Sequence, residues 1–479
     1  MHRKVSTGIL GLDEILRGGL ERGWAYLLKG GPGSGKTIFG LQFLFAGVEK
    51  GEKVVYLSFD EPKEEVAMQA ESFGWNIDSP NFHFIDKVSE TDILSSDLLF
   101  IGFDSISEIH SFIESITKLE ELKGASRVFI DGMSILRDAS KDPSIYRRIV
   151  SSIIQFFNKK NITSVIAEEL TTEVGREIIS YLTSGEFVLE RVVRNDGEVF
   201  RTINVLKYRG GNAWLGRHYF DITPQGIVVY PIIPLNAREE TKRERKLLST
   251  GSPELDAMLG GGIYDGSDVL IAGKSGVGKT NMCLQMLIEN DRRGDVGILY
   301  SFEETEEVIA HRLKTLFNYT PSKLVVKHVS PYGMNLGKFY RMVTDDVWSY
   351  NPSIVAIDPI NSLQRMALTS EELTRALQLL CPFLSARGTI MLQTYEVSEA
   401  ADIFQFTGGG ISYLCDYLIL GRFMEMNGEL LKVIAVMKNR FGDHERTLRV
   451  LHMKEGEGLK IGEPLRSYAG LMVGTLREI

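Results

Sequence analysis

The chain has 479 residues, of which 43% are hydrophobic and 24% charged, and its formal net charge is −9. This is the composition of a soluble globular protein that can bury a sizeable core, and the negative charge argues against a nucleic-acid-binding protein. No apolar run is long enough to cross a membrane, and the first residues lack a signal-peptide pattern. We therefore expect a cytoplasmic protein with no membrane and no nucleic-acid partner. The cysteines Cys283, Cys381 and Cys415 are far apart in sequence, which excludes a disulfide framework.

A phosphate-binding loop lies near the start of the chain, between a predicted strand at residues 24–30 and a predicted helix at residues 37–51. The segment GGPGSGKT, residues 30–37, fits the pattern G-x-x-x-x-G-K-[ST]. In such a loop backbone N–H groups point at phosphate oxygens, the lysine reaches the β and γ phosphates, and the following hydroxyl binds Mg²⁺. The sequence predicts an ATP and Mg²⁺ site at Gly31, Gly33, Ser34, Gly35, Lys36 and Thr37.

An acidic pair follows the next predicted strand. The strand at residues 53–59 leads into Asp60 and Glu61, and a helix is expected over residues 66–75. A carboxylate at the end of such a strand can polarise a water or another hydroxyl for attack on the γ-phosphate. Both acids are therefore candidate catalytic residues; the alternative is a solvated helix N-terminus, which also favours acids.

Another acidic residue ends a later strand of the same half. Residues 127–131 form an apolar run that ends in Asp131, and another strand is predicted at residues 163–169. Asp131 is a candidate Mg²⁺ ligand that acts through water, and Thr37 supplies a hydroxyl to the same ion. A helix cap or a turn after the strand is the alternative role for Asp131.

The second half repeats this pattern at matching intervals, which indicates a duplicated domain. The segment GKSGVGKT, residues 273–280, is a second phosphate-binding loop, and Ser6 and Ser249 precede the two loop lysines by the same number of residues. The repeat adds strands at residues 353–358 and 389–395, the candidate ATP-binding residues Lys274, Ser275, Gly276, Val277, Gly278, Lys279 and Thr280, the candidate catalytic acids Glu303 and Glu304, and the candidate Mg²⁺ ligands Thr280 and Asp358.

Alternating strands and helices predict an α/β fold in each half, with a mainly parallel sheet flanked by helices. Ligands of such sheets bind at the carboxyl ends of the strands, where the loops and acids fall. The predicted organisation is a first domain at residues 1–233, a charged linker at 234–246, a second domain at 247–461 and a short tail at 462–479.

These tandem motifs resemble the KaiC family of double-domain RecA-type ATPases and autokinases. The resemblance covers essentially the whole chain and includes KYRG at residues 207–210 and KNR at residues 438–440. It implies two tandem RecA-like P-loop domains and a homohexameric ring of two tiers. It also implies that certain cations, otherwise expected to be solvated strand residues, reach the triphosphate of a neighbouring subunit: Lys207, Arg209, Lys438 and Arg440.

The resemblance further implies a phosphorylation site in the second half. Residues 408–420 resemble the family segment that carries two adjacent phosphoacceptors, and here Ser412 occupies the first place while Tyr413 occupies the second. The family's ordered two-site cycle cannot run unchanged with Tyr413. Phosphorylation of Ser412, with Glu303 as base, is the expectation; the alternatives are that Ser412 is a turn residue after a glycine run, or that Tyr413 is the phosphoacceptor.

The two halves differ in ways that indicate different roles. Asp60 stands where the second half has Glu303, so its carboxylate reaches one methylene less far. Either Glu61 polarises the water in the first half, or hydrolysis there is slow. The first half has no Ser or Thr acceptor in an equivalent setting and is expected to be a hydrolase. Its longer segment around residues 81–124 is compatible with a nucleotide lid, a partner surface or a plain longer loop and helix.

Two other functions share these motifs. A RecA/RadA-like DNA-dependent ATPase has the same core, but the sequence has no zinc-finger cysteines and no basic patch with interleaved aromatic residues. In the other, ATP serves only to hold the subunits of a ring together. The acid pairs argue against this function, because they would have no role in such a ring. The tail resembles the start of the family's regulatory segment, and we expect the longer segment that binds an activating partner to be absent. A signalling or timing role outside a true oscillator is expected.

Overall fold

The computed structural model describes residues 4–86, 106–138, 140, 142–170, 178–235, 244–397, 414–426, 428–465, 468–469 and 477–478. The chain divides into two compact units, Met1–Ile233 and Pro234–Ile479. Ser412 and Tyr413 lie outside the described residues. Within the part that is described, no helix combines the length and the apolar character needed to cross a bilayer.

The first unit alternates strands and helices as predicted. Its elements are β1 (Lys4–Val5), α1 (Leu12–Ile15), β2 (Leu20–Glu21), β3 (Ala25–Gly30), α2 (Lys36–Val48), β4 (Val54–Ser58), α3 (Lys63–Glu71), β5 (Phe82–Asp86), α5 (Ile106–Thr117), η1 (Glu120–Leu122), β6 (Arg127–Asp131), α6 (Met133–Asp138), α7 (Pro143–Lys159), β7 (Thr163–Glu169), α8 (Ile178–Leu182), β8 (Gly185–Val193), β9 (Val199–Tyr208), β10 (Gly216–Thr223) and β11 (Gly226–Tyr230).

The predicted strands are confirmed as β3, β4, β6 and β7, and the first predicted helix as α2. Helix α3 begins three residues before the predicted range 66–75 and ends at Glu71. Its first turn holds Glu64 and Glu65, which the positive end of a helix favours. It ends early because Gly74 adopts a φ of 75°, outside helical geometry.

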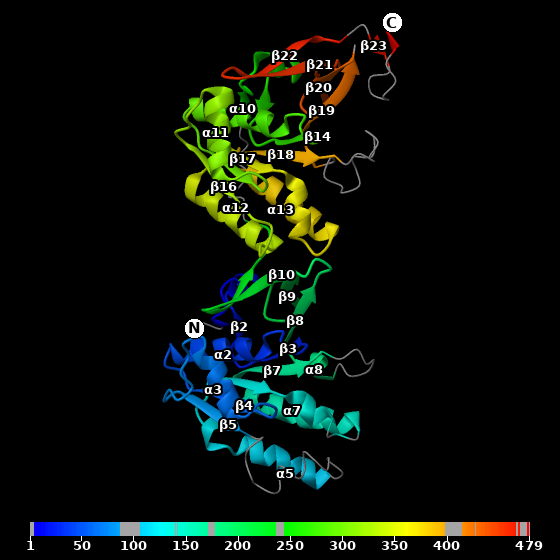
Figure 1. Ribbon diagram of the computed structural model, residues 1–479. Coiled ribbons are helices and arrows are strands. Elements are labelled where there is room, and N and C mark those ends of the chain that lie inside the picture. Colours follow the sequence, from blue (N-terminus) through cyan, green and yellow to red (C-terminus); the bar gives the residue numbers. More distant parts are fainter. Residues whose placement is uncertain are drawn as a thin grey trace. The chain divides into compact units, whose positions relative to one another are not determined.

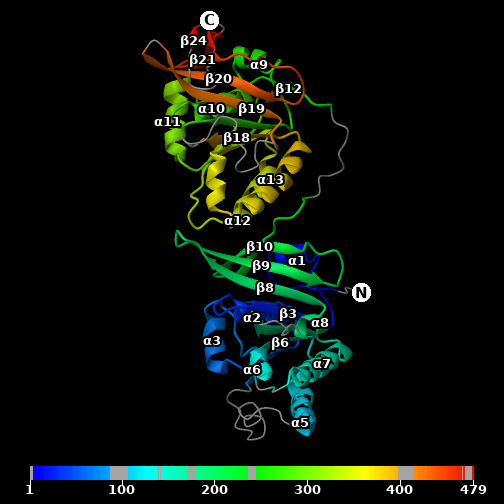
Figure 2. The same cartoon turned by 90° about the vertical axis from the view of Figure 1, so that its right-hand side faces the viewer.

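The nine-stranded sheet of the first unit has the order β5-β4-β6-β7-β3-β8-β9-β10-β11. The strands from β5 to β8 are parallel, and β9, β10 and β11 continue the sheet in antiparallel pairs. Figure 2 shows β8, β9 and β10 side by side. The strand that leads into the phosphate loop, β3, therefore lies inside the sheet between two parallel neighbours.

Both faces of this sheet are buried, which requires near-continuous apolar strands. Tyr26 and Leu28 pack on one face in a cluster with residues of α2, whereas Ala25 and Leu27 pack on the other in a cluster with residues of α7. Figure 1 shows the helices on the two sides of the sheet. The alternation follows from the two-residue period of a strand.

The second unit repeats this architecture. Its elements are β12 (Leu247–Leu248), α9 (Pro253–Met258), β13 (Ile263–Tyr264), β14 (Asp268–Gly273), α10 (Lys279–Arg292), β15 (Gly297–Ser301), α11 (Glu306–Phe317), β16 (Leu324–His328), α12 (Leu336–Tyr350), β17 (Ile354–Asp358), η2 (Ile360–Arg365), α13 (Ser370–Ser385), β18 (Ile390–Glu396), β19 (Tyr417–Met426), β20 (Glu429–Asn439), β21 (Arg449–Lys454), β22 (Gly458–Pro464), β23 (Tyr468–Ala469) and β24 (Arg477–Glu478).

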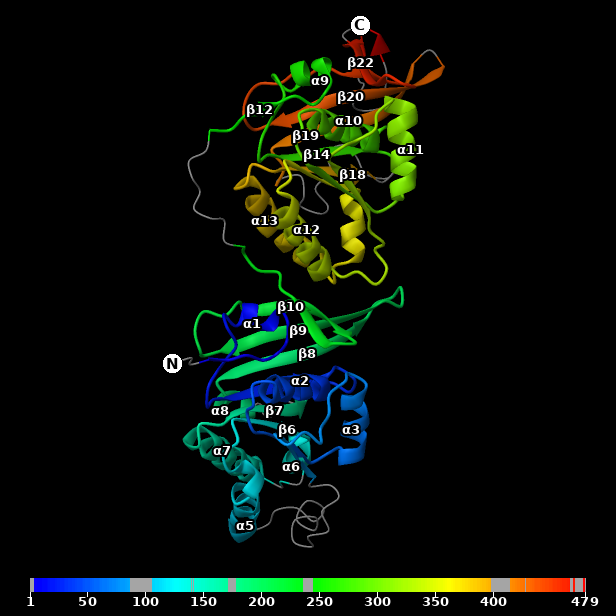
Figure 3. The same cartoon turned by 90° about the vertical axis from the view of Figure 1, so that its left-hand side faces the viewer.

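The nine-stranded sheet of the second unit has the order β16-β15-β17-β18-β14-β19-β20-β21-β22, the same as in the first. Its strands are parallel from β16 to β19, and the rest pair antiparallel. Helices α12 and α13 lie side by side against it (Figure 3). Two tandem domains, each a mainly parallel sheet flanked by helices, confirm the predicted fold class.

Candidate nucleotide-binding sites

The first phosphate loop lies at the carboxyl end of β3 and leads directly into α2. Gly33 and Gly35 have φ values of 68° and 105°, a left-handed backbone that glycine adopts without strain. A Cβ added at Gly31 or Gly33 would meet nothing within 4 Å, so the loop faces open space. The Lys36 Nζ donates to the backbone oxygen of Gly30 at 2.9 Å. A glycine-lined loop with an amine and a helix N-terminus fits a polyphosphate.

The second loop has the same geometry at the carboxyl end of β14. Gly276 and Gly278 have φ values of 79° and 111°, and the Lys279 Nζ donates to the backbone oxygen of Lys274 at 3.0 Å. Lys279 is buried, and burial lowers the pKa of its amine. The carboxylates of Glu396, Asp358 and Glu303 oppose that shift because they favour the charged amine.

Asp131, the candidate Mg²⁺ ligand, lies at the end of β6 and close to Thr37. The Thr37 Oγ1 is 3.4 Å from Asp131 Oδ2, and the Tyr56 hydroxyl donates to the same oxygen at 2.7 Å. Burial raises the pKa of Asp131, while Tyr56 and Lys36 act in the opposite direction. Hydroxyl and carboxylate oxygens are the hard ligands that Mg²⁺ prefers, and the ion keeps several of its waters when it binds to a protein.

Asp358 occupies the matching position in the second unit. Ser301 of β15 pairs with Asp358, as Ser58 of β4 pairs with Asp131. The Asp358 carboxylate accepts a hydrogen bond from the Thr394 hydroxyl on β18. The equivalent aspartates of the two halves thus accept hydrogen bonds from different side chains, Tyr56 in the first half and Thr394 in the second.

The acidic pairs lie in identical turns after β4 and β15. The Ser58 hydroxyl donates to the backbone oxygen of Glu61 at 2.6 Å, and the Ser301 hydroxyl donates to that of Glu304 at 2.7 Å. Burial raises the pKa of Glu61, and the nearby Asp131 and Asp60 raise it further. The turn therefore places the predicted acid pair of the first half close enough to Asp131, the predicted Mg²⁺ ligand, for their charges to interact.

In the second half the acids differ in their surroundings. Glu303 is exposed, but part of its side chain is buried. This partial burial raises its pKa, and the nearby carboxylates of Glu396 and Asp358 raise it too. Burial also raises the pKa of Glu304, whereas the ion pair with Arg312 lowers it. The second acid of this pair is thus held by a cation.

A cavity of about 840 Å³ lies beside the second phosphate loop. Its lining includes Lys274 and Ser275 of the loop, Glu303, and Glu396 at the end of β18. A cavity of this size can hold a ligand as large as a nucleotide. Sequence reasoning missed Glu396 because the predicted strand, residues 389–395, stopped one residue short of it. An acid at the end of an apolar strand was the signal that could have found it.

The four predicted neighbour-reaching cations do not approach the phosphate loop of their own half. In the first unit Lys207 pairs with Glu186, which pairs with Leu27 of β3, and the Arg209 N–H donates to Ser184 near the start of β8. The phosphate loop follows the other end of β3. At 3.3 Å per residue Leu27 lies about 10 Å from Gly30, where the loop begins, and the Lys207 Nζ donates to the backbone oxygen of Thr183, away from the loop.

The second unit has the same arrangement. The Lys438 Nζ donates to the backbone oxygen of Cys415 at 2.6 Å, and Arg440 Nη1 lies 3.6 Å from Asp416 Oδ1. Asp416 bonds through its N–H to Asp268, the first residue of β14. These cations therefore lie at the amino edge of the parallel strands and the phosphate loops at the carboxyl edge.

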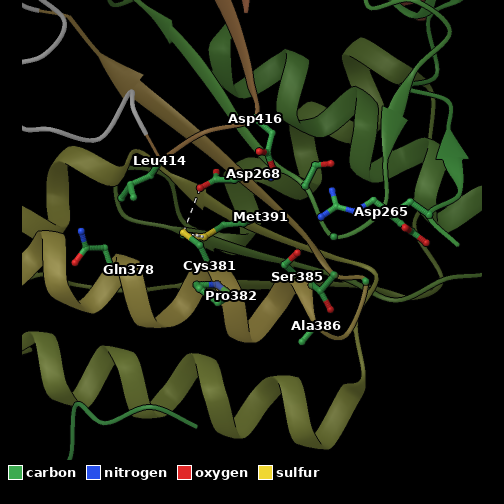
Figure 4. A pocket seen from close by; sticks show the side chains of 15 residues that line it. Asp265, Asp268, Gln378, Cys381, Pro382, Ser385, Ala386, Met391, Leu414 and Asp416 are labelled. Carbon is green, nitrogen blue, oxygen red and sulfur yellow. Dashed lines mark hydrogen bonds between the residues drawn. The ribbon is translucent and has the colours of Figure 1, made fainter. Parts of the chain in front are cut away.

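A second cavity, of about 590 Å³, lies at this amino edge (Figure 4). Figure 4 shows Asp268 above the sulfur atoms of Cys381 and Met391. The Cys381 thiol donates to Asp268 Oδ2 at 3.2 Å and lies 3.6 Å from the Met391 sulfur. Burial raises the pKa of Asp268 to about 6. Asp416, the ion-pair partner of Arg440, also lines this cavity, so the cavity lies next to that cation.

The fold and the two loops define the class of the protein: it has two tandem RecA-like P-loop domains, each built to bind a nucleotide. A family model described as "ATPase: KaiC" matches residues 5–233 and again 248–466. The chain therefore belongs to the KaiC family of ATPases.

Curated relatives match over nearly the whole chain. A Synechocystis protein named circadian clock protein KaiC3 is 30% identical over 98% of this chain and 94% of its own length. Another, named circadian clock protein KaiC2, is 29% identical over 99% of this chain and 84% of its own length. A Picosynechococcus circadian clock oscillator protein KaiC is 26% identical over 100% of this chain and 93% of its own length.

Proposed function

We propose that the protein is a homohexameric, Mg²⁺-dependent ATPase whose second half phosphorylates Ser412 of its own chain, with a signalling or timing role. The observation that carries this proposal is the distribution of groups over each sheet: phosphate loop and acids at the carboxyl edge, and cations at the amino edge. The relatives named above as circadian clock proteins support the timing role. A cytoplasmic location fits the same role.

Each half would bind one ATP. The proposed phosphate ligands are Gly31, Gly33, Ser34, Gly35, Lys36 and Thr37 in domain 1–233, and Lys274, Ser275, Gly276, Val277, Gly278, Lys279 and Thr280 in domain 247–461. Mg²⁺ would be held by Thr37 with Asp131 and by Thr280 with Asp358, where it would neutralise charge on the phosphates. Residues 234–246 would serve as the linker and 462–479 as a regulatory tail.

The separation of the two edges supports the proposed ring. Each of these cations bonds at the amino edge of its own sheet and does not reach the phosphate loop of its own half: Lys207, Arg209, Lys438 and Arg440. In a head-to-tail ring the amino edge of one subunit faces the carboxyl edge of the next. The cations would then stabilise charge on the neighbour's transferring phosphoryl group, as an arginine finger does.

The chemistry at the carboxyl edge would be proton abstraction. An acid of each pair accepts a proton from the attacking group as the new P–O bond forms and the bond to ADP breaks. In the first half the attacking group would be water and the product inorganic phosphate. In the second half the attacking group would be the Ser412 hydroxyl, with Glu303 as the base.

Mass spectrometry of the purified chain after incubation with ATP and Mg²⁺ tests the proposal. We expect phosphate on Ser412, its loss in Lys279→Ala, and weaker ring assembly in Lys36→Ala. An unmodified residue 412 would contradict the kinase activity and leave the ATPase activity intact. Stimulation of hydrolysis by DNA would favour a RecA/RadA-like function instead, and no phosphate release at either site would favour a ring held together by bound ATP.

A further inference from the structure

The second acid of each pair is contacted by the same helix position in the two halves, but by different side chains. On α3 the Gln69 Nε2 donates to Glu61 Oε2 at 3.2 Å. On α11 the Arg312 guanidinium forms an ion pair with Glu304. Each contacting residue follows its acid by eight positions along the chain. A neutral amide in one half thus stands where the other half has a cation.

Arg312 is held in place from a second side. Its Nη1 donates to Asn281 Oδ1 at 3.1 Å, and Asn281 follows Thr280 at the start of α10. The first half has Ile38 after Thr37, and isoleucine offers no such acceptor. A guanidinium fixed at both ends is a strong partner for a carboxylate, because charge-assisted hydrogen bonds are about twice as strong as neutral ones. Glu304 is therefore bound to a cation that does not readily move away.

The first acids of the two pairs differ in the length of their side chains. Glu303 is exposed and lines the 840 Å³ cavity together with Lys274 and Ser275. Its counterpart Asp60 is also exposed but is one methylene shorter. The first half thus combines a short first acid with a second acid that has only an amide partner. The second half combines a long first acid with a second acid in an ion pair.

We propose that Gln69 and Arg312 are positioning residues that decide which acid of each pair acts as the base: Glu61 in the first half and Glu303 in the second. The inference rests on the proposed ATPase function. A carboxylate engaged by a fixed guanidinium has its negative charge compensated, so it accepts a proton less readily than it would without that cation. A carboxylate that accepts one bond from a neutral amide has no cation to compensate its negative charge, and it gains a defined orientation.

The second half is tested in a chain whose first-half acids are both neutralised, Asp60→Asn with Glu61→Gln. The first loop can then still bind ATP, while phosphate release and phosphate transfer report the second half. We expect Glu303→Gln to lower the rate about 100-fold, as expected for loss of a general base. Adding Arg312→Gln should recover about tenfold of that loss, because Glu304 is released from its ion pair and can accept the proton.

Two controls separate this effect from a general loss of charge or structure. Arg312→Lys keeps the cation and should give no recovery in the Glu303→Gln chain. Lys314→Gln removes a cation from an exposed position of the same helix, and it should give no recovery either. Recovery with Lys314→Gln, or none with Arg312→Gln, would overturn the role of Arg312.

The first half is tested with the second-half acids neutralised, Glu303→Gln with Glu304→Gln. Gln69→Arg should lower kcat for phosphate release about tenfold and change KM for ATP less than twofold, since it compensates the charge of Glu61 without touching the phosphate loop. Met68→Arg adds the same charge at the adjacent exposed position and should leave the rate unchanged. An unchanged kcat in Gln69→Arg would overturn the role of Gln69.

Failure of this inference and failure of the proposed function give different results. If the unmodified chain releases no phosphate from ATP, the proposed function is wrong and the inference falls with it. If the unmodified chain is active but the exchanges at positions 69 and 312 have no effect, only the inference is wrong.

Discussion

Asp268 has an unusual environment for a carboxyl group. It is buried at the start of β14, where Gln393 and the Cys381 thiol donate to it. Burial is the largest influence and the nearby Asp416 adds to it, while the two hydrogen bonds and Lys438 oppose it; together they raise the pKa of Asp268 from 3.8 to about 6. The folded state therefore prefers the protonated acid, and this preference stabilises the fold below pH 4 and is lost as the pH rises through about 6.

The variant Asp268→Asn tests this pH dependence. The asparagine stays neutral, so the unfolding free energy of the variant should rise relative to the unmodified chain between pH 4 and 7, by about 3 kcal/mol at most. Trp348 is the one tryptophan of the second unit, so its fluorescence in urea reports that unit when Trp24, Trp75 and Trp214 of the first unit are replaced by Phe in both chains. A difference between the two chains that does not change with pH would show that Asp268 is not the group responsible.

At the scale of elements, the packing of the phosphate-loop helix on the sheet distinguishes the halves. A Cβ added at Gly40 of α2 would lie 2.3 Å from the Phe129 ring on β6, so the helix can approach the sheet only with glycine there. The matching position on α10 is Cys283, and the matching position on β17 is Ala356, both fully buried. Side-chain volume has moved from the strand to the helix.

This exchange predicts coupled stability effects. Gly40→Cys should destabilise the first unit by about 1–3 kcal/mol through overpacking, and Phe129→Ala by about 3–5 kcal/mol through a cavity. The double variant should be less destabilised than the sum of the two by about 1–3 kcal/mol. Urea unfolding of a Trp348→Phe chain, whose remaining tryptophans lie in the first unit, measures all three. Additive effects would contradict direct packing between the two positions.

Elements were predictable wherever one local pattern sufficed. The glycine pattern located both phosphate loops, and apolar runs located β3, β4, β6, β7, β17 and β18. The end of α3 was missed because the helical period continues past Glu71, while the backbone turns at Gly74. Tyr56 and Thr394 escaped prediction because each reaches its acid from a neighbouring strand, and strand order is not visible in sequence.

At the scale of the whole molecule, the duplication was readable from constant intervals, and the structure has the same strand order in both units. The contacts that distinguish the two sites were not readable. Gln69 and Arg312 lie in surface helices whose composition is ordinary, and their importance depends on which helix face turns toward the acids. The site residues inferred from the motifs remain predictions that the experiments above would test.

The placement of Lys279 and Arg440 at opposite edges of one sheet has a consequence for inheritance. In the proposed ring each second-half site has two owners, since one chain supplies the loop and its neighbour the cations. A chain with Lys279→Ala and a chain with Lys438→Ala and Arg440→Ala would each be inactive alone. Mixed rings should regain about a quarter of full phosphate transfer, because half of the loops are intact and half of their neighbours supply cations.

Mixing the two chains before ATP is added, then measuring transfer, checks this complementation. Mixed rings that stay inactive would contradict shared sites. A chain that carries both defects would instead damage two sites in every ring that it enters, its own and its neighbour's. Such an allele would be dominant over the normal one, whereas the two single defects would rescue each other.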